Sequence, residues 1–340
     1  MTSRALAVTR EQILGYRRRA GALDARLQRS KRSFRTAAWA GLQDSMPRAA
    51  VLSINARIER TEPTAWEDPA LVQIWGPRYN VYAVAAQDLA VFTLGRFPDD
   101  PTARHRATDL AFRLEALLGG KTMPADQAGR ALGGHPNRLR YATTTGTVVV
   151  RWEGARQPTV RSVPPPDVDP AEARRELARR FLHVFGPATA EDFGVWAGIR
   201  TPGALAAFDQ LEASMSSVAT PIGSAWMLDS DVEALRVTQE PEAAVRLLPS
   251  GDSYFLLQGD QRRLLLPNAD HRQLLWTSRV WPGAVLADGE IVGTWRRAKD
   301  RVTIRAWSDL GRNLRDRIFA EAATLPIPEN RGQMTVLWAE

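Results

Sequence analysis

The chain has 340 residues, 44% of them hydrophobic and 24% charged, so it is long enough for two or three domains with proper cores and is not expected to be disordered. It contains no cysteine and only four histidines, which excludes disulfides, cysteine-ligated zinc, iron–sulfur clusters and thiol nucleophiles, and we expect neither a metal nor a cofactor. The formal net charge is +7, and of the 45 basic residues three are Lys and 42 are Arg. This balance favours a nucleic-acid partner, although a GC-rich genome would give the same bias.

No run of about 18 apolar residues is present, so no membrane span is expected. The segment from Met1 to Arg19 is rich in arginine and lacks the apolar region of a secretion signal. We therefore expect a cytoplasmic protein without a membrane partner. We also expect it to be a monomer.

The first predicted module covers residues 1–105. Apolar residues at helical spacing predict helices, and an alternating run predicts one strand. The expected helices are 9–29, 48–60, 66–75 and 87–94, and the expected strand is 79–84.

The second module, residues 106–165, reads as three short helices followed by a β-ribbon near Val148, which is the pattern of a winged helix-turn-helix. Three prolines at 164–166 separate it from the third module, residues 166–240. That module has helices over 171–185, 190–197 and 202–215 and a wing strand at Trp226 to Leu228.

From residue 241 to 340 the apolar pattern alternates, which predicts a β-rich domain resembling a barrel, with one helix over 310–323. The Asp288-Gly289 pair marks a two-residue hairpin. The expected strands are 245–248, 254–257, 263–266, 284–286, 291–295, 302–306 and 333–338. The predicted class is α+β.

Several stretches resemble a known family in order along the chain. Gly41-Leu42-Gln43 and Trp75-Gly76-Pro77-Arg78 resemble the first module of the winged-helix DNA glycosylases of the AlkZ and YcaQ type. The third module and the C-terminal domain carry further matches. They are the run from Arg175 to Leu182, Phe185-Gly186-Pro187-Ala188-Thr189, Trp196-Ala197-Gly198, Leu247-Leu248-Pro249, Trp281-Pro282-Gly283 and Gly293-Thr294-Trp295-Arg296.

The resemblance implies tandem winged helices in a C-shaped arrangement that holds duplex DNA. It also implies hydrolysis of the N-glycosidic bond of alkylated purines, including bulky adducts and interstrand cross-links, in DNA repair or in self-resistance to a genotoxin.

The family's catalytic pattern is Gln, an apolar residue, then Gln or Asp, whereas this chain has Gln43, Asp44 and Ser45. We expect Gln43 to orient a water molecule, with Asp44 as the candidate carboxylate and Ser45 as a weaker one. The alternative is that Asp44 and Ser45 only cap the helix that follows. After Arg78, where relatives often carry Gly-Thr-x-His, this chain has Asn80 and Tyr82, which we expect to hold the water or the sugar backbone.

A basic DNA-facing surface is predicted from arginines in the modules that resemble the family's DNA-binding elements. Each of them could equally be a solvated surface residue. They are Arg35, Arg48, Arg57, Arg78, Arg138 and Arg140.

Two classes of function follow. The first is a glycosylase acting on alkylated duplex DNA. The second is a non-catalytic winged-helix DNA-binding protein, such as a regulator or a lesion sensor, because the Gln43-Asp44-Ser45 sequence departs from the catalytic pattern. A scaffold that binds nucleotides or protein is a third, weaker alternative.

Overall fold

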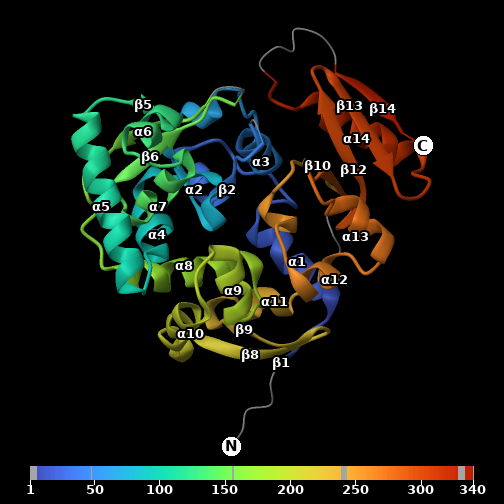
Figure 1. Ribbon diagram of the computed structural model, residues 1–340. Coiled ribbons are helices and arrows are strands. Elements are labelled where there is room, and N and C mark those ends of the chain that lie inside the picture. Colours follow the sequence, from blue (N-terminus) through green and yellow to red (C-terminus); the bar gives the residue numbers. More distant parts are fainter. Residues whose placement is uncertain (1–5, 47, 155–156, 239–242, 328–333, 340) are drawn as a thin grey trace, which may run out of the picture.

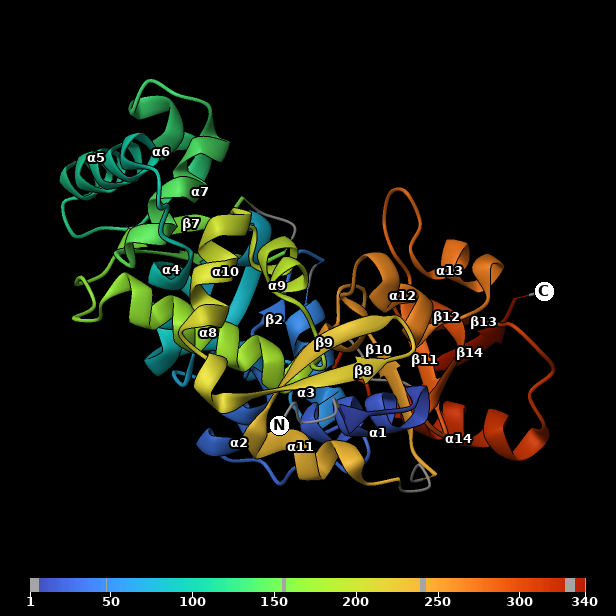
Figure 2. The same ribbon diagram turned by 90° about the horizontal axis from the view of Figure 1, so that it is seen from below.

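Three β-sheets organise a mixed α+β fold in the computed structural model, which describes residues 6–46, 48–154, 157–238, 243–327 and 334–339. The second module and the C-terminal sheet lie on opposite sides of the molecule, and the third module lies between them (Figure 1). Figure 2 shows the same separation from a perpendicular direction. The first module occupies the centre and touches all three.

The first module begins with a short strand and a helix and ends with short helical turns. Its elements are β1 (Leu6–Ala7), α1 (Arg10–Ala20), α2 (Lys31–Ala37), β2 (Leu42–Gln43), α3 (Ala49–Arg57), η1 (Ala65–Glu67), β3 (Leu71–Trp75), η2 (Pro77–Tyr79), β4 (Val81–Ala85), η3 (Ala86–Asp88), α4 (Leu89–Thr93) and η4 (Leu94–Arg96). Capping boxes at Thr9 and Ser30 fix the starts of α1 and α2, because each hydroxyl accepts a backbone N–H of the first turn.

The second module shares a sheet with the first. Its elements are α5 (Pro101–Leu118), β5 (Met123–Pro124), α6 (Ala125–Ala131), η5 (Pro136–Arg138), α7 (Leu139–Ala142), η6 (Thr143–Thr145), β6 (Val148–Arg151) and β7 (Thr159–Ser162). The six strands run in the order β2-β4-β3-β6-β7-β5, and the two halves meet where Gln73 of β3 pairs with Val150 of β6. The two modules are therefore joined through backbone pairing.

The third module has the three expected helices and a β-hairpin wing, and the helix expected over 202–215 ends at Asp209. Its elements are α8 (Pro170–Phe185), α9 (Ala190–Ala197), α10 (Thr201–Asp209), η7 (Glu212–Ser214), β8 (Met215–Thr220), β9 (Gly223–Leu228) and α11 (Asp229–Arg236). Strand β1, from the N-terminal end of the chain, pairs in parallel with β8 and completes this sheet. The predicted wing strand at Trp226 lies in β9.

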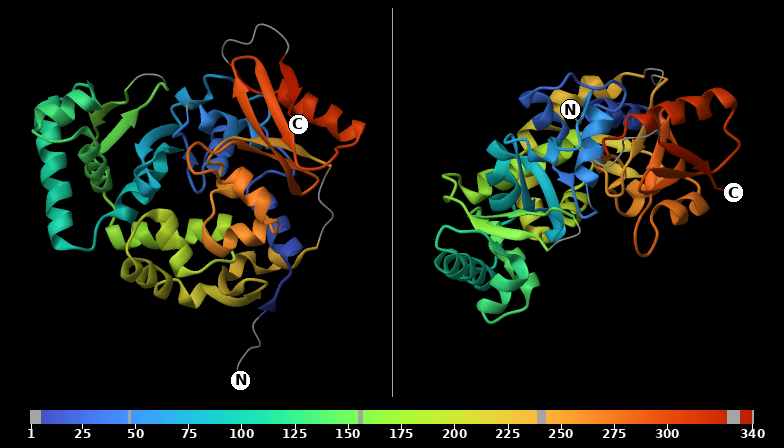
Figure 3. Two further views of the ribbon diagram at one scale, coloured as in Figure 1. Left: turned by 45° about the vertical axis from the view of Figure 1, so that its right-hand side comes forward. Right: turned by 90° about the horizontal axis from the view of Figure 1, so that it is seen from above.

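The C-terminal domain is a five-stranded sheet with α14 against one face (Figure 3). Its elements are β10 (Val245–Leu248), η8 (Ser253–Phe255), α12 (Gly259–Leu265), α13 (Ala269–Leu275), β11 (Gly283–Ala287), β12 (Glu290–Ala298), β13 (Arg301–Ala306), α14 (Arg312–Ala323) and β14 (Thr335–Trp338). The strands follow the order β10-β11-β12-β13-β14, and the Asp288-Gly289 turn joins β11 to β12 as predicted. Closure into a barrel stays a prediction.

Several local predictions were wrong. The helix expected over 9–29 ends at Ala20. Residues 66–75, expected to be helical, form η1 and then strand β3, because their apolar side chains pack inside the sheet on both faces. Residues 254–257 and 263–266, expected to be strands, form η8 with an irregular segment and the end of α12. Leu264 and Leu265 are buried at the end of α12, where their backbone carbonyls accept hydrogen bonds from Arg10. These tertiary contacts, rather than the strand propensity of a short apolar run, decide the local structure.

A single large core joins all four predicted domains, since it also contains Val149 of β6. It includes Leu14 of α1, Tyr82 of β4, Phe181 of α8 and Leu248 of β10. The boundaries at residues 105, 165 and 240 stay predictions, because neither the shared sheet nor this continuous core separates the modules there.

No helix in the described part of the chain is long and apolar enough to cross a membrane. Within the same residues, no group of three or more His, Asp or Glu side chains is arranged to hold a metal ion.

Candidate active site

Gln43 lies at the junction between the first module and the C-terminal domain. It ends β2, where its register partner in β4 is Tyr82. The buried Tyr82 ring directs its hydroxyl toward Gln43, and the hydroxyl donates to Oε1 at 3.4 Å. On the other side, the loop after β10 places Gly251 against the Gln43 amide: a Cβ at residue 251 would lie 2.9 Å from Nε2. The half-buried amide is thus held from two domains.

Asp44 points into the protein. Only 1% of the residue is exposed, and its two carboxylate oxygens accept hydrogen bonds from the Ala50 backbone N–H at 3.0 Å and from Gln73 Nε2 at 2.8 Å. Burial raises the pKa of Asp44 from 3.8 to about 6, while the hydrogen bonds from Ala50 and Gln73 and the charge of Arg48 act in the opposite direction. Asp44 therefore caps the first turn of α3, as the capping alternative predicts.

Gln73 extends this arrangement to the second module. Its Nε2 donates to Asp44, and its Oε1 accepts from the backbone N–H of Trp152 at 2.7 Å. Because Gln73 is 5% exposed and lies in the middle of β3, the Asp44 carboxylate is coupled to the end of β6 through one rigid amide.

Ser45 opens on a cavity of about 450 Å³ next to this network. Its hydroxyl oxygen is buried and has no hydrogen-bond partner among the described residues. Three predicted site residues meet in this cavity, namely Ser45, Asn80 and Arg140, and the aromatic side chains of Trp75, Tyr79 and Trp152 form part of its wall. The cavity therefore combines an amide and a cation with aromatic surface, while the Ser45 hydroxyl oxygen is buried in its wall.

The turn between β3 and β4 is strained. Arg78 and Tyr79 both have positive φ, at 53° and 59°, a conformation that residues with a side chain rarely adopt. Gly198 at the end of α9 packs on this turn, where a Cβ would lie 3.1 Å from the Arg78 nitrogen. The guanidinium of Arg96 lies 4.8 Å from the Tyr79 ring centre, and burial lowers the pKa of Arg96 to about 10. The third module and a buried cation thus hold Tyr79 in the cavity wall.

The remaining predicted arginines divide into two groups. Arg48 stacks on Trp66, with its guanidinium carbon 3.9 Å from the ring centre, and Arg78 is half-buried with its Nε unpartnered among the described residues. Arg138 is exposed but faces a second cavity in the neighbouring module. The predicted arginines do not gather in one place.

Two of the arginines need correction. Arg57 is 1% exposed and forms a two-point ion pair with Asp252, at 2.7 and 2.8 Å, so it cannot reach a DNA phosphate. Arg35 is half-buried and binds both oxygens of Asp88, at 3.0 and 2.8 Å. Sequence reasoning placed both on the DNA-facing surface because their carboxylate partners lie far away along the chain.

Sequence patterns assign no role to Gln73, Trp152 or Gly251, which the structure places around the motif. The signal for Gly251 is weak but present, because a Gly in the loop after a predicted strand marks a close backbone approach. Gln73 and Trp152 carry no local signal, since their contacts depend on how two modules share a sheet.

Comparison with known proteins assigns the family. The sequence model of the family described as "DNA glycosylase AlkZ-like" matches residues 36–326 of this chain. The chain belongs to this family. A curated relative, the "Interstrand DNA cross-link repair glycosylase" of Streptomyces sahachiroi, is 26% identical over 148 residues, which cover 42% of this chain and 39% of that relative. The solved structure of the Streptomyces sahachiroi DNA glycosylase AlkZ superposes with a TM-score of 0.80 at 18% identity, covering 98% of this chain and 100% of that one.

The fold of this AlkZ-like protein therefore agrees with that of a DNA glycosylase. The Gln43-Asp44-Ser45 sequence differs chemically from a motif whose carboxylate can reach the substrate. Both Asp44 oxygens accept hydrogen bonds inside the protein.

Proposed function

We propose that this AlkZ-like protein hydrolyses the N-glycosidic bond of alkylated purines in duplex DNA, with bulky adducts or interstrand cross-links as its substrates. The observation that carries the proposal is the cavity beside the motif, where Ser45, Asn80 and Arg140 meet aromatic side chains. Such a site can stack a base and contact its sugar-phosphate backbone. The name of the cross-link repair relative from Streptomyces sahachiroi supports the same class of substrate.

The reaction needs little from the protein's acids. A purine alkylated at N7 or N3 is already cationic, so the C–N bond breaks with the electron pair on the base and without prior protonation. The protein then has to orient water toward the anomeric carbon. In this proposal the Gln43 Oε1 accepts a hydrogen bond from that water, with the Tyr82 hydroxyl keeping the amide oriented.

Ser45 and Asp44 have different roles in this proposal. Ser45 lies in the wall of the cavity, and its buried hydroxyl becomes available to water or the sugar after a change of its side-chain rotamer. Asp44 is a positioning residue, because its carboxylate fixes the start of α3 and Gln73 while remaining out of contact with the cavity. The negative charge of Asp44 still stabilises a cationic transition state nearby, though less than a carboxylate in contact would.

The alternative is a DNA-binding protein without glycosylase activity. The burial of Asp44 favours it, because this carboxylate cannot accept a proton from a water in the cavity without breaking the cap of α3. In that case the cavity would recognise a modified base and the protein would act as a lesion sensor.

The experiment that separates the two is incubation with duplex DNA containing a single N7-alkylguanine, followed by measurement of abasic sites. We expect release by the wild type and a loss of about 100-fold or more for Gln43→Ala, the usual scale for a residue that activates water. Tight binding without any release assigns the protein to the lesion-sensor class. Release that Gln43→Ala leaves unchanged moves the active centre elsewhere.

A further inference from the structure

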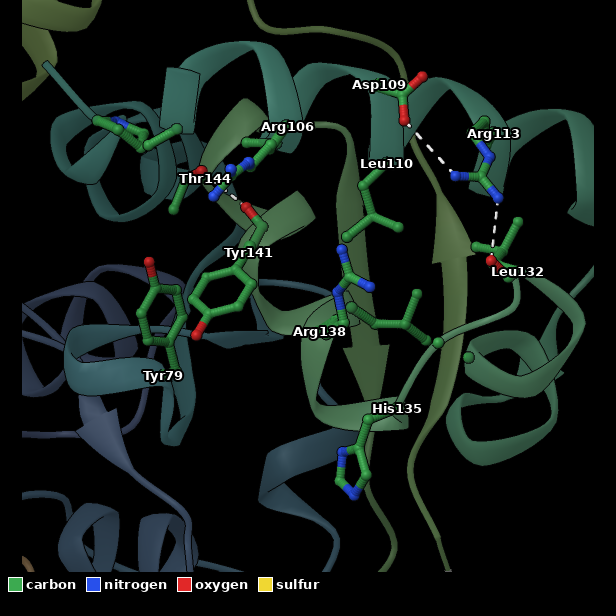
Figure 4. A pocket seen from close by; sticks show the side chains of 16 residues that line it. Tyr79, Arg106, Asp109, Leu110, Arg113, Leu132, His135, Arg138, Tyr141 and Thr144 are labelled. Atoms are coloured by element: carbon green, nitrogen blue, oxygen red, sulfur yellow. Dashed lines mark hydrogen bonds and ion pairs between the residues drawn. The ribbon is translucent and has the colours of Figure 1, made fainter. Parts of the chain in front are cut away.

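A second cavity, of about 390 Å³, lies in the second module between α5 and the η5–α7 segment. Figure 4 shows the rings of Tyr79 and Tyr141 at one end, Arg113 and Leu132 at the other, and Arg138 between them. Neither the family assignment nor the proposed reaction uses this cavity.

Most of the cavity wall is apolar and part of it is aromatic. Leu110 and Leu132 contribute aliphatic surface, and Tyr141 is 51% exposed. Tyr79 and Tyr141 meet edge to face, with ring centres 5.0 Å apart and planes at 81°. Exposed rings in this arrangement favour a flat aromatic ligand that can add a further offset or edge contact.

The charged groups around the cavity are mainly cationic. Arg113 pairs with Asp109 at 3.6 Å and donates to the Leu132 carbonyl at 2.9 Å. By contrast, the side chains of Arg106 and Arg138 have no hydrogen-bond or ion-pair partner within the described ranges. Three arginines against one aspartate leave the wall positive, so the ligand that fits it carries an anion or a strong acceptor.

The cavity shares part of its wall with the candidate active site. Tyr79, held at positive φ in the strained turn, lines both cavities. The η5–α7 segment supplies Arg138 and Tyr141 to one cavity and Arg140 to the other. Strain of this kind persists where the surrounding structure enforces it, and it is common at binding sites.

We propose that this cavity binds an aromatic group that carries an anionic or strongly accepting substituent. Two sources have this chemistry: a free aromatic acid, or the substituent of an alkylated base whose purine lies in the cavity beside Ser45. The second source rests on the proposed function, and the first does not.

The binding site is tested by calorimetric titration of the full chain with biphenylcarboxylate, and with biphenylmethylamine as the ligand of opposite charge. We expect saturable one-to-one binding of the acid and none of the amine. Because two guanidinium contacts to a carboxylate are lost, Arg106→Gln combined with Arg138→Gln should weaken the acid at least about tenfold. Leu110→Trp, which fills the cavity, should abolish binding.

The matched control is Arg32→Gln combined with Arg175→Gln, two exposed arginines outside the cavity, which should leave the affinity unchanged. The Arg106 and Arg138 side chains form no hydrogen bond or ion pair with the described residues, so that double variant is expected to keep its fold even if Leu110→Trp does not. Equal binding of the amine, absence of saturation, or unchanged affinity in the double arginine variant would overturn the site.

The source is identified by base release from duplexes with N7-(4-carboxybenzyl)guanine or N7-methylguanine, each with saturating biphenylcarboxylate. Slower release of the carboxybenzylated base alone assigns the cavity to the substituent of the lesion. Equal effects on the two bases, or none on either, assign it to a free acid. If neither base is released, the proposed function fails, and the calorimetry still decides the site.

Discussion

The side chain of Gln43 lies against the backbone of Gly251, so a loop of the C-terminal domain limits where the Gln43 amide can move. The same loop continues into Asp252, whose carboxylate is held by Arg57 and Ser53 of α3. Helix α3 follows the motif directly. Helix α3, the first helix after Gln43 in the chain, thus anchors the loop that packs on Gln43.

Gly251→Ala should displace the Gln43 amide, because the added Cβ would lie 2.9 Å from Nε2 at a position with φ of +77°. We expect base release to fall at least about tenfold while duplex affinity stays constant, since misplacement by a fraction of an ångström is costly in an oriented reaction. Gly120→Ala is the control: its φ is +80° and a Cβ there meets nothing within 4 Å. Equal losses in both variants would attribute the effect to backbone strain.

The burial of Asp44 predicts an unusual pH dependence of stability. Because the pKa of Asp44 rises from 3.8 to about 6 on folding, the folded state binds more protons than the unfolded state between about pH 4 and pH 6. The contribution of Asp44 to the free energy of unfolding therefore decreases as the pH rises through this interval, by about 3 kcal/mol.

The measurement is urea denaturation of the wild type and Asp44→Asn at pH 4 and pH 7. The wild type should lose about 2 to 3 kcal/mol relative to the variant between the two values, because the other acids titrate alike in both proteins. A difference that is independent of pH would mean that Asp44 titrates in its ordinary range.

Arg57 should prove a structural residue. Replacing it by Met leaves the Asp252 carboxylate buried without its cation, which costs about 3 to 5 kcal/mol of folding free energy. The double variant Arg57→Met with Asp252→Leu should recover most of that loss, since neither charge is then buried. Equilibrium denaturation measures both. A single variant as stable as the wild type would mean that the Arg57–Asp252 pair contributes nothing to folding.

Duplex binding should depend steeply on salt, and Arg140 should account for part of the slope. If Arg140 neutralises one phosphate at the mouth of its cavity, Arg140→Gln lowers the slope of log affinity against log salt by about 0.9. Titrations of an unmodified duplex from low to moderate salt give the slope. The exposed Arg175, on α8, provides the control variant, which should keep the wild-type value.

The element types that depend on long regular patterns could be predicted from the sequence. The amphipathic spacing of Leu177, Phe181 and Phe185 gives α8, and the Asp288-Gly289 turn gives the β11–β12 hairpin. Short apolar runs could not be assigned, because residues 71–75 and 263–266 are decided by which surface covers them.

At the candidate site the sequence located the motif but not the direction of its side chains. Asp and Ser are cap residues as well as catalytic ones, and the geometry places Asp44 on Ala50 while Ser45 stays unpaired among the described residues. The misplacement of Arg57 has a related cause: a buried ion pair and an exposed cation look identical until the distant partner Asp252 is known.

The pairing of β1 with β8 has a consequence for biosynthesis. Leu6 and Ala7 find their register partners only in Val218 and Ala219. At about 5 to 20 residues per second, the ribosome needs about 10 to 40 s to make the intervening chain. For that time the first strand emerges without its neighbour, so the third sheet is completed late, after the module that precedes it in the chain has had time to fold.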